Sequence, residues 1–415
     1  MNSASPASGP SYLRIILTVF LPFAGGYYIS YFFRSVNAII APALTTDMSL
    51  SAGDLGLLTA AYFISFAAFQ LPIGIILDRY SPPKVQTVLL LMAALGAFVF
   101  ATGETKFMLF IGRALIGLGV AGGLMAGFKV IILWFPRDRL PLVNSIFMAF
   151  GGLGALSATA PVEAAMALTD WRGVYATIGV ATAVVALLIL LVTPEKPRED
   201  SSETISDMVK GLFSVYRDGV FWHTSPVAFS SAAAGLAIQG LWSGPWLEHV
   251  AGASRAEIAS HLFITALCMT IGFTLQGLIT DFVYRKWRIR PQTVMVVGMI
   301  LFVVFQLGII FELTWMSYFL WAAFGLVSNF SAINFAVLSQ HYPLEKSARA
   351  NSAMNVLVFA VAFAAQYAIG AIIDLFPATA SGGYPPEAFQ VAFGAIAAVQ
   401  IAAIIWYFVF KPRRD

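Results

Sequence analysis

The sequence predicts an all-α membrane protein, with twelve transmembrane helices arranged as two pseudo-symmetric six-helix bundles. Hydrophobic residues make up 59% of the 415 positions and charged residues 11%, whereas a soluble domain carries about 25% charge. Apolar runs of about 18 residues or more, each long enough to cross a bilayer, recur along the whole chain. The two halves also repeat each other, since Gly74 and Asp78 are matched at the same spacing by Gly277 and Asp281.

The individual elements follow from the apolar runs and from helix-start signals. Ser51-x-x-Asp54 and Ser254-x-x-Glu257 have the pattern of capping boxes, which predicts that the second and eighth spans begin there. The twelve spans are expected near 16–42, 54–77, 85–103, 107–133, 143–168, 173–193, 223–247, 257–280, 292–311, 315–338, 349–374 and 386–410.

An even number of spans places both termini on one side of the membrane. Most of the 24 Lys and Arg residues lie on that side, and only Lys106, Arg172 and Arg255 lie in loops on the other. The positive-inside rule therefore predicts cytoplasmic termini, and we expect a multi-pass protein of a bacterial cytoplasmic (inner) membrane.

The expected domain organisation has four parts. These are a disordered cytoplasmic tail at 1–14, an N-terminal six-helix bundle at 15–193, a cytoplasmic linker at 194–222, and a C-terminal bundle with a short tail at 223–415. Within the linker, apolar residues from Ile205 to Tyr216 follow helical spacing. This pattern predicts either an amphipathic helix on the membrane surface or a mobile linker with chance spacing.

The loop after the second span resembles that of the major facilitator superfamily. The family pattern is Gly-x-x-x-Asp-[Arg/Lys]-x-Gly-x-[Arg/Lys]-[Arg/Lys], which Gly74, Asp78, Arg79 and Lys84 match, whereas Ser81 replaces its second Gly and Pro83 a basic residue. Arg113-x-x-x-Gly117-x-Gly119 resembles the signature of the fourth span. The resemblance covers residues 15–410 and implies transport.

This resemblance also implies a set of gating residues. They are Gly74, Asp78, Arg79, Lys84, Gly277, Asp281 and Arg285. A carboxylate favours the positive N-terminal end of a helix, so Asp78 is expected to cap span eleven near Asn351, and Asp281 to cap span five near Asn144. These contacts would hold the halves together when the cytoplasmic side is closed. Alternatively, the motif residues only stabilise the loops.

Four charged residues lie inside spans: Arg34, Arg113, Lys129 and Glu163. An ionisable residue in hydrocarbon costs at least ~2.5–3.5 kcal/mol, so it needs a partner or a function. Tyr27, Tyr31, Arg34 and Asn37 share one helical face, and a guanidinium there suits bidentate capture of a carboxylate or phosphate. Tyr31, Arg34 and Asn37 are therefore predicted substrate contacts, although backbone carbonyls could instead satisfy Arg34.

The other three charges leave alternatives open. Arg113 either faces the cavity as a second substrate contact or pairs with Glu163, which is also the candidate for proton coupling. Lys129 lies about 160° around the helix from Arg113. It is therefore either a third substrate contact or a side chain that reaches toward the membrane surface.

The second half offers amides and aromatic rings instead of charges. The candidate substrate contacts are Gln239, Trp242, Asn334, Asn355 and Gln366, although each could equally pack between helices. Pro245 is expected to bend the seventh span near Trp242.

The first span resembles the anion:cation symporter branch of the superfamily, whose Arg at this position binds organic anions. That branch commonly carries an acid just before this Arg and another after the fourth-span Arg. Phe33 and Val120 occupy those positions here, so the resemblance extends to the anion site and not to the proton relay.

These observations predict a secondary transporter that takes up a small organic anion, such as a carboxylate or sugar acid, with proton coupling left open. A proton-driven exporter of drugs or metabolites is the alternative. We expect no enzyme activity, no cofactor and no nucleic-acid partner. His261 and Cys268 share a helical face, but so few ligands predict no metal site. Membrane lipid is the expected environment, and the protein is expected to be a monomer.

Overall fold

The computed structural model describes residues 11–136, 139–196, 205–342, 344–379 and 383–411. The regular elements of the first half in these ranges are α1 (Tyr12–Ile15), η1 (Ile16–Phe20), α2 (Leu21–Ser35), α3 (Asn37–Met48), α4 (Ala52–Arg79), α5 (Pro82–Ala101), α6 (Lys106–Val120), α7 (Gly123–Trp134), α8 (Leu140–Ser157), α9 (Ala160–Met166) and α10 (Trp171–Val192). The linker helix α11 (Ile205–Tyr216) follows.

The regular elements of the second half are also helices in its described residues. Its elements are α12 (Gly219–Ala237), η3 (Ile238–Trp242), α13 (Ser243–His249), α14 (Arg255–Trp287), α15 (Pro291–Ile310), η4 (Thr314–Met316), α16 (Ser317–Ser328), η5 (Asn329–Ala332), α17 (Ile333–His341), α18 (Leu344–Ile373) and α19 (Pro386–Val409).

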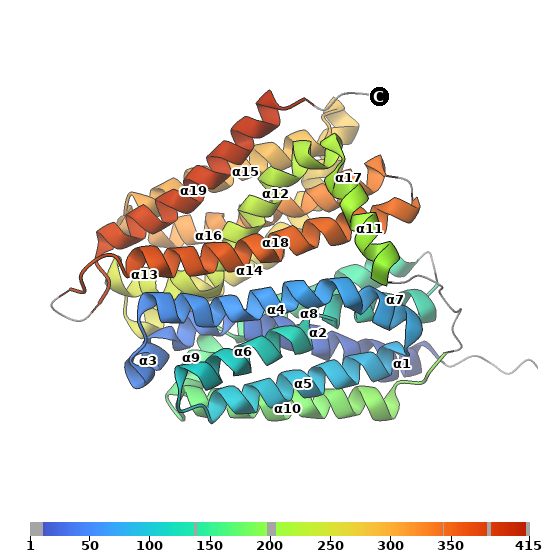
Figure 1. The fold of residues 1–415 in the computed structure, drawn as a ribbon, viewed down its shortest axis with the longest axis horizontal. Helices are drawn as coiled ribbons and strands as arrows, with labels where there is room; N and C mark the ends of the chain where they lie inside the picture. The colour runs from blue at the N-terminus through green and yellow to red at the C-terminus, as the bar shows by residue number, and fades with distance from the viewer. Residues whose placement is uncertain (1–10, 137–138, 197–204, 343, 380–382, 412–415) are drawn as a thin grey trace, which may run out of the picture.

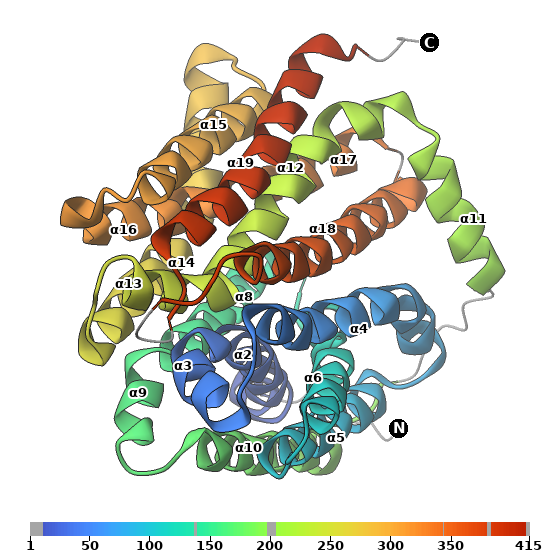
Figure 2. The same ribbon diagram turned by 60° about the vertical axis from the view of Figure 1, so that its left-hand side comes forward.

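The helices form two bundles, one from each half of the chain (Figure 1). The antiparallel helices α4 and α18 lie side by side between them, as Figure 2 also shows. We call the end of the molecule where α4 ends and α18 begins the termini end, because α1 and the end of α19 lie there. The other end, where α4 begins and α18 ends, is called the opposite end.

The predicted fold class is confirmed, and the protein is a multi-pass membrane protein. Eleven helices in the described residues are long and apolar enough to cross a membrane. The predicted seventh span is the remaining one, and it is divided among α12, η3 and α13.

Both predicted capping boxes are present. The Ser51 hydroxyl accepts a hydrogen bond from the amide of Asp54 at 3.1 Å, and the Asp54 carboxylate accepts one from the amide of Ser51. Ser254 and Glu257 make the same exchange at the start of α14. These pairs satisfy amides that a helix start leaves without partners. They explain why the two long helices begin where the sequence predicts.

Several predicted spans, the first and the seventh among them, are interrupted. The first is divided at Val36, between α2 and α3, so it is not one straight helix from 16 to 42. The seventh contains the π-helical turn η3, in which the amide of Ser243 donates to the carbonyl of Ile238. Pro245 follows this turn and has no N–H to donate to the carbonyl of Leu241. The irregularity therefore lies just before the proline that was expected to bend the span.

The linker contains the predicted helix, α11, which packs against α18. The Tyr216 hydroxyl donates to the carbonyl of Ala353 at 3.0 Å. This contact ties the linker helix to the second half. The side chains of 205–209, on which much of the predicted amphipathic pattern depends, lie outside the described part of the structure.

Candidate functional site

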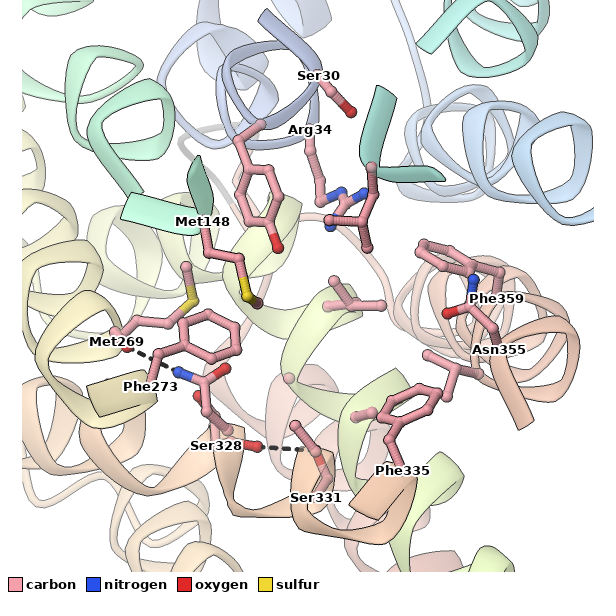
Figure 3. Close-up of a pocket in the computed structure, with 18 of the residues that line it drawn as sticks. Ser30, Arg34, Met148, Met269, Phe273, Ser328, Ser331, Phe335, Asn355 and Phe359 are labelled. Atoms are coloured by element: carbon pink, nitrogen blue, oxygen red, sulfur yellow. Dashed lines mark hydrogen bonds between the residues drawn. The ribbon is translucent and has the colours of Figure 1, made fainter. Parts of the chain in front are cut away.

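A cavity with a volume of about 1210 Å³ lies between the two halves. Helices α2, α4, α7 and α8 line it from the first half, and α12, α14, α17 and α18 line it from the second. Figure 3 shows the side chains that project into it. Both halves therefore contribute to one central site.

The cavity extends toward the termini end of the molecule. Gly74, late in α4, and Gly277 with the exposed Leu278, late in α14, belong to its lining. At the opposite end, Trp242, Trp246 and Gln366 are completely or almost completely buried and do not line it. The structure is therefore open at the termini end and closed at the opposite end.

Arg34 is the cation deep in this cavity. It lies in the last turn of α2, and its guanidinium carbon is 4.5 Å from the ring centroid of Tyr31 and 5.4 Å from those of Phe66 and Phe359. No carboxylate among the described residues forms an ion pair with Arg34, and its Nε atom is buried without a hydrogen-bond partner. The aromatic faces stabilise the cation, and the Tyr62 side chain also lies against it, but its Nε donor remains available to a ligand.

Tyr31 also lines the cavity, whereas Asn37 and Arg113 do not. The fully buried Arg113 donates to the carbonyl of Phe33 at 3.2 Å and to the hydroxyl of Tyr175 at 3.0 Å. The Tyr175 hydroxyl in turn donates to the Asn37 side-chain oxygen at 2.8 Å. Arg113 and Asn37 therefore belong to a buried network behind Arg34, and the break at Val36 accompanies the turn of Asn37 away from the cavity.

The alternative expected for Arg113, an ion pair with Glu163, is not formed. Glu163 lies on α9 at the opposite end, beside a small cleft of about 230 Å³ that Glu248 and Arg255 also line. Lys129 is half-buried on α7 and is not part of the lining of the central cavity.

Two of the five polar candidates of the second half face the cavity. Gln239 and Asn355 line it, and the Asn355 amide donates to the side-chain oxygen of Gln70, in the first half, at 3.2 Å. Asn334 is buried outside the lining, where its amide donates to the Ser225 hydroxyl at 3.2 Å. The hydrogen bond between Asn355 and Gln70 therefore joins the two halves across the site.

Trp242 and Gln366 form part of the seal at the opposite end. In the orientation that satisfies both groups of the amide, the Gln366 nitrogen donates to the carbonyl of Ala237 and its oxygen accepts from Trp242 Nε1, each at 3.1 Å. A Cβ at Gly56 would lie 2.8 Å from the carbonyl oxygen of Gln366. The close approach of α4 and α18 there requires glycine.

The predicted gating residues occupy the open end. Gly74 and Gly277 line the cavity, and the exposed Arg79 ends α4. Asp281 forms an ion pair with Arg285 at 2.9 Å within α14, in place of the predicted contact with span five.

The remaining basic residue of the loop, Lys84, forms an ion pair with Glu195 at 2.9 Å. The side chain of Asp78 lies outside the described part of the structure. The predicted latch contact of Asp78 therefore remains a prediction.

Sequence reasoning missed several residues of the site. Ser30 shares the cavity-facing side of α2 with Tyr31 and Arg34, so helical spacing could have found it. Phe66 and Gln70 are four residues apart on α4, but no charge drew attention to them. Asp374, which contacts the start of α4, is the last residue of the predicted eleventh span and was not counted among the charges within spans.

A helical membrane protein with a polar, cation-bearing cavity between two halves, open at one end only, is built as a transporter. The sequence profile of the Major Facilitator Superfamily matches residues 23–291, and the chain belongs to that family. The resemblance predicted from the loop motif is therefore confirmed. The family and the relatives described next are transporters, not enzymes.

Three curated relatives show the range of similarity. The uncharacterized transporter YybO of Bacillus subtilis is 32% identical over 38% of this chain. The probable sulfoacetate transporter SauU of Cupriavidus necator is 22% identical over 63%, and the hexuronate transporter of Bacillus subtilis is 26% identical over 66%. The matched regions span 36%, 64% and 65% of those relatives, respectively.

A solved structure shares the fold over nearly the whole chain. It is a bacterial homologue of the human lysosomal transporter Spinster in an inward-facing and unoccupied conformation. The TM-score is 0.79, the sequence identity is 17%, and 97% of each chain is covered. Identity at this level supports the shared architecture alone.

Proposed function

We propose that this protein is a secondary transporter that takes up a small organic anion by alternating access. The observation that carries the proposal is Arg34, a cation in the central cavity with no carboxylate partner among the described residues. A guanidinium without a carboxylate partner in the protein favours a carboxylate or sulfonate ligand, because it can make two parallel charge-assisted hydrogen bonds to it. The names of the relatives that transport sulfoacetate and hexuronate support the same class of cargo.

The proposed site combines Arg34 with Tyr31, Gln239 and Asn355, which share the cavity lining. In this proposal the protein works as a monomer in the bacterial inner membrane, with both termini in the cytoplasm. The structure then represents the inward-open state. Arg113 supports the site from behind, and Glu163 remains the candidate for proton coupling.

The proposal is tested by uptake into proteoliposomes, with a radiolabelled panel of monocarboxylates, dicarboxylates, sugar acids and sulfonates. Loss of one partner of a desolvated charge pair costs 2–5 kcal/mol, so Arg34→Gln should weaken binding of the cargo about 30-fold or more. Arg34→Lys should restore only part of the affinity, because an ammonium lacks the planar fork.

Lys210→Gln is the matched control, because it removes one positive charge from an exposed position on α11. It should bind and transport like the unmodified protein. Unchanged anion uptake in Arg34→Gln would disprove the proposed site.

The second candidate function, export of amphipathic compounds, is favoured by the many Met, Phe and Leu side chains of the lining. Arg34 disfavours cationic drugs within that class. Accumulation of neutral amphipathic compounds in everted vesicles, unaffected by Arg34→Gln, would support the exporter over the anion importer.

A further inference from the structure

The walls that face Arg34 across the cavity are mainly apolar. Met148 projects from α8, Met269 and Phe273 from α14, Phe335 from α17, and Phe359 from α18 (Figure 3). Thioether and aromatic side chains bind apolar groups and adapt to their shape. Arg34 therefore lies at one side of the cavity, and the other sides present few hydrogen-bonding groups to a hydroxyl group of a cargo.

Much of the polar surface on these walls already has partners within the protein. The Asn329 amide donates to the carbonyl of Met269 at 2.8 Å, and the Ser331 hydroxyl donates to the carbonyl of Ser328 at 3.2 Å. The Asn355 amide is bonded to Gln70. These groups would have to break an existing hydrogen bond before donating to a cargo.

The side-chain groups of Ser30 and Gln239 line the cavity and have no hydrogen-bond partner among the described residues. They come from α2, which also carries Arg34, and from η3, whose Gly240 approaches the backbone of Arg34.

Gln276 and Asn351 also line the cavity and have side-chain oxygens without a partner among the described residues, but Gln276 precedes Gly277 late in α14 and Asn351 lies near the start of α18, both toward the open end. The free polar groups beside Arg34 thus belong to the elements that hold or adjoin the cation. The walls farther from Arg34 present an apolar surface that suits the apolar part of a cargo.

A second acidic group on the cargo would lack a partner beside Arg34 in the cavity. The other cation of the lining, Arg349, lies ten residues before Phe359 on α18, hence about 15 Å nearer the open end at 1.5 Å per residue. It packs there beside Gly211 of the linker helix.

We propose that the cargo is a monoanion with an apolar body, an aryl- or alkyl-carboxylate or sulfonate, and not a sugar acid or a compact dicarboxylate. The acid group binds Arg34 with help from Ser30 and Gln239, and the body lies against Met148, Phe335 and Phe359. This inference rests on the proposed anion transport. It narrows the class of cargo at the same site.

The test compares four probes of similar size by isothermal titration of the purified protein. They are 3-phenylpropionate, the hydroxylated monoanion gluconate, the dianion succinate, and the neutral 3-phenyl-1-propanol. An apolar pocket discriminates against added hydroxyl groups by about 10- to 100-fold. 3-Phenylpropionate should therefore bind 10- to 100-fold more tightly than gluconate or succinate, and its binding should depend on Arg34.

The outcomes separate the two proposals. Gluconate or succinate binding as tightly as 3-phenylpropionate, with affinity lost in Arg34→Gln, would overturn this inference and leave anion transport standing. Absence of Arg34-dependent binding for every anion would overturn both. Equal binding of 3-phenyl-1-propanol and 3-phenylpropionate would show that the acid group is not recognised.

Phe335 offers a second test at the apolar wall. Phe335→Gln introduces an amide opposite Arg34, and it should reduce the preference for 3-phenylpropionate over gluconate at least 5-fold. Phe335→Leu keeps an apolar surface and should retain most of the preference. Thermal unfolding of both variants without ligand identifies any loss of folding, and an unchanged preference in a folded Phe335→Gln would contradict the assigned wall.

Discussion

The carboxylate of Asp374, just after α18, accepts a hydrogen bond from the backbone amide of Gly53, in the first turn of α4, at 2.7 Å. It also accepts from the amide of Ala52 and from the Ser51 hydroxyl, each at 2.8 Å. An acid of the second half thus caps a helix of the first half. The contact holds the opposite end of the molecule closed while the termini end is open.

Replacement of this acid should change the balance between the two conformations. Asp374→Asn removes the charge and should weaken the cap by about 1–2 kcal/mol, which changes a two-state population ratio about 5- to 30-fold. The expected shift is toward states open at the opposite end. Electron–electron distances between spin labels at the exposed positions Leu168 and Trp315, one in each half, would measure it.

Glu387→Gln is the matched control for this prediction. Glu387 is an exposed acid in the first turn of α19, in the same half and at the same end as Asp374. Its loss should leave the distance distribution unchanged. A cap without influence on gating would give the same distribution in Asp374→Asn as in the unmodified protein.

Gly56 should be intolerant of even one added methyl group. A Cβ at this position would lie 2.8 Å from the carbonyl oxygen of Gln366, a backbone atom that cannot move aside. Gly56→Ala should therefore force α4 and α18 apart at the closed end and reduce uptake several-fold. Gly394→Ala, where a Cβ meets nothing within 4 Å, serves as the control and should leave uptake unchanged.

Arg113 should affect anion binding without contacting the anion. It donates to the carbonyl of Phe33, the residue before Arg34, and to Tyr175, so its loss should disturb the position of Arg34. Arg113→Gln and Tyr175→Phe should each weaken binding about 5- to 10-fold, and less than additively in combination, because they belong to one network. Titration of the three variants measures this.

The comparison also tests the direct role predicted for Arg113. If its guanidinium bound the cargo itself, Tyr175→Phe would leave affinity almost unchanged while Arg113→Gln abolished it. A folded Tyr175→Phe with normal affinity would therefore contradict the positioning role.

The pair formed by Gln366 and Trp242 should stabilise the closed end. Gln366→Leu leaves the buried indole N–H without an acceptor and should lower stability by about 1–3 kcal/mol. Adding Trp242→Phe removes the unsatisfied donor, although it also removes buried ring surface. Thermal unfolding should show the double variant to be more stable than the sum of the single effects, and additive effects would show that the hydrogen bond contributes nothing.

Local signals in the sequence predicted the architecture well. Apolar runs, capping boxes at Ser51 and Ser254, and the loop motif depend on residues close together in the chain. They located the helices and the family. The direction of Arg34 toward the central cavity also followed, because helical spacing places it on the face that carries Tyr31.

Contacts between distant segments were not predictable in this way. Asn37 and Arg113 meet through Tyr175, which no periodic pattern connects to either of them. Asp374 was also missed, although Ala167 occupies the corresponding position of the first half and the pair therefore breaks the repeat. Charges at the ends of spans that break the repeat merit the same attention as charges within them.

Two residues of the π-helical turn η3 have different roles. Gln239 reaches the cavity and Trp242 reaches the seal. A π-turn holds one residue more than the α-helical turn it replaces, and each residue of an α-helix turns it by about 100°. Deleting a single residue here would restore regular winding and keep α13 in phase, but it would change the relative direction of Gln239 and Trp242, so the number of residues in this turn is itself under structural constraint.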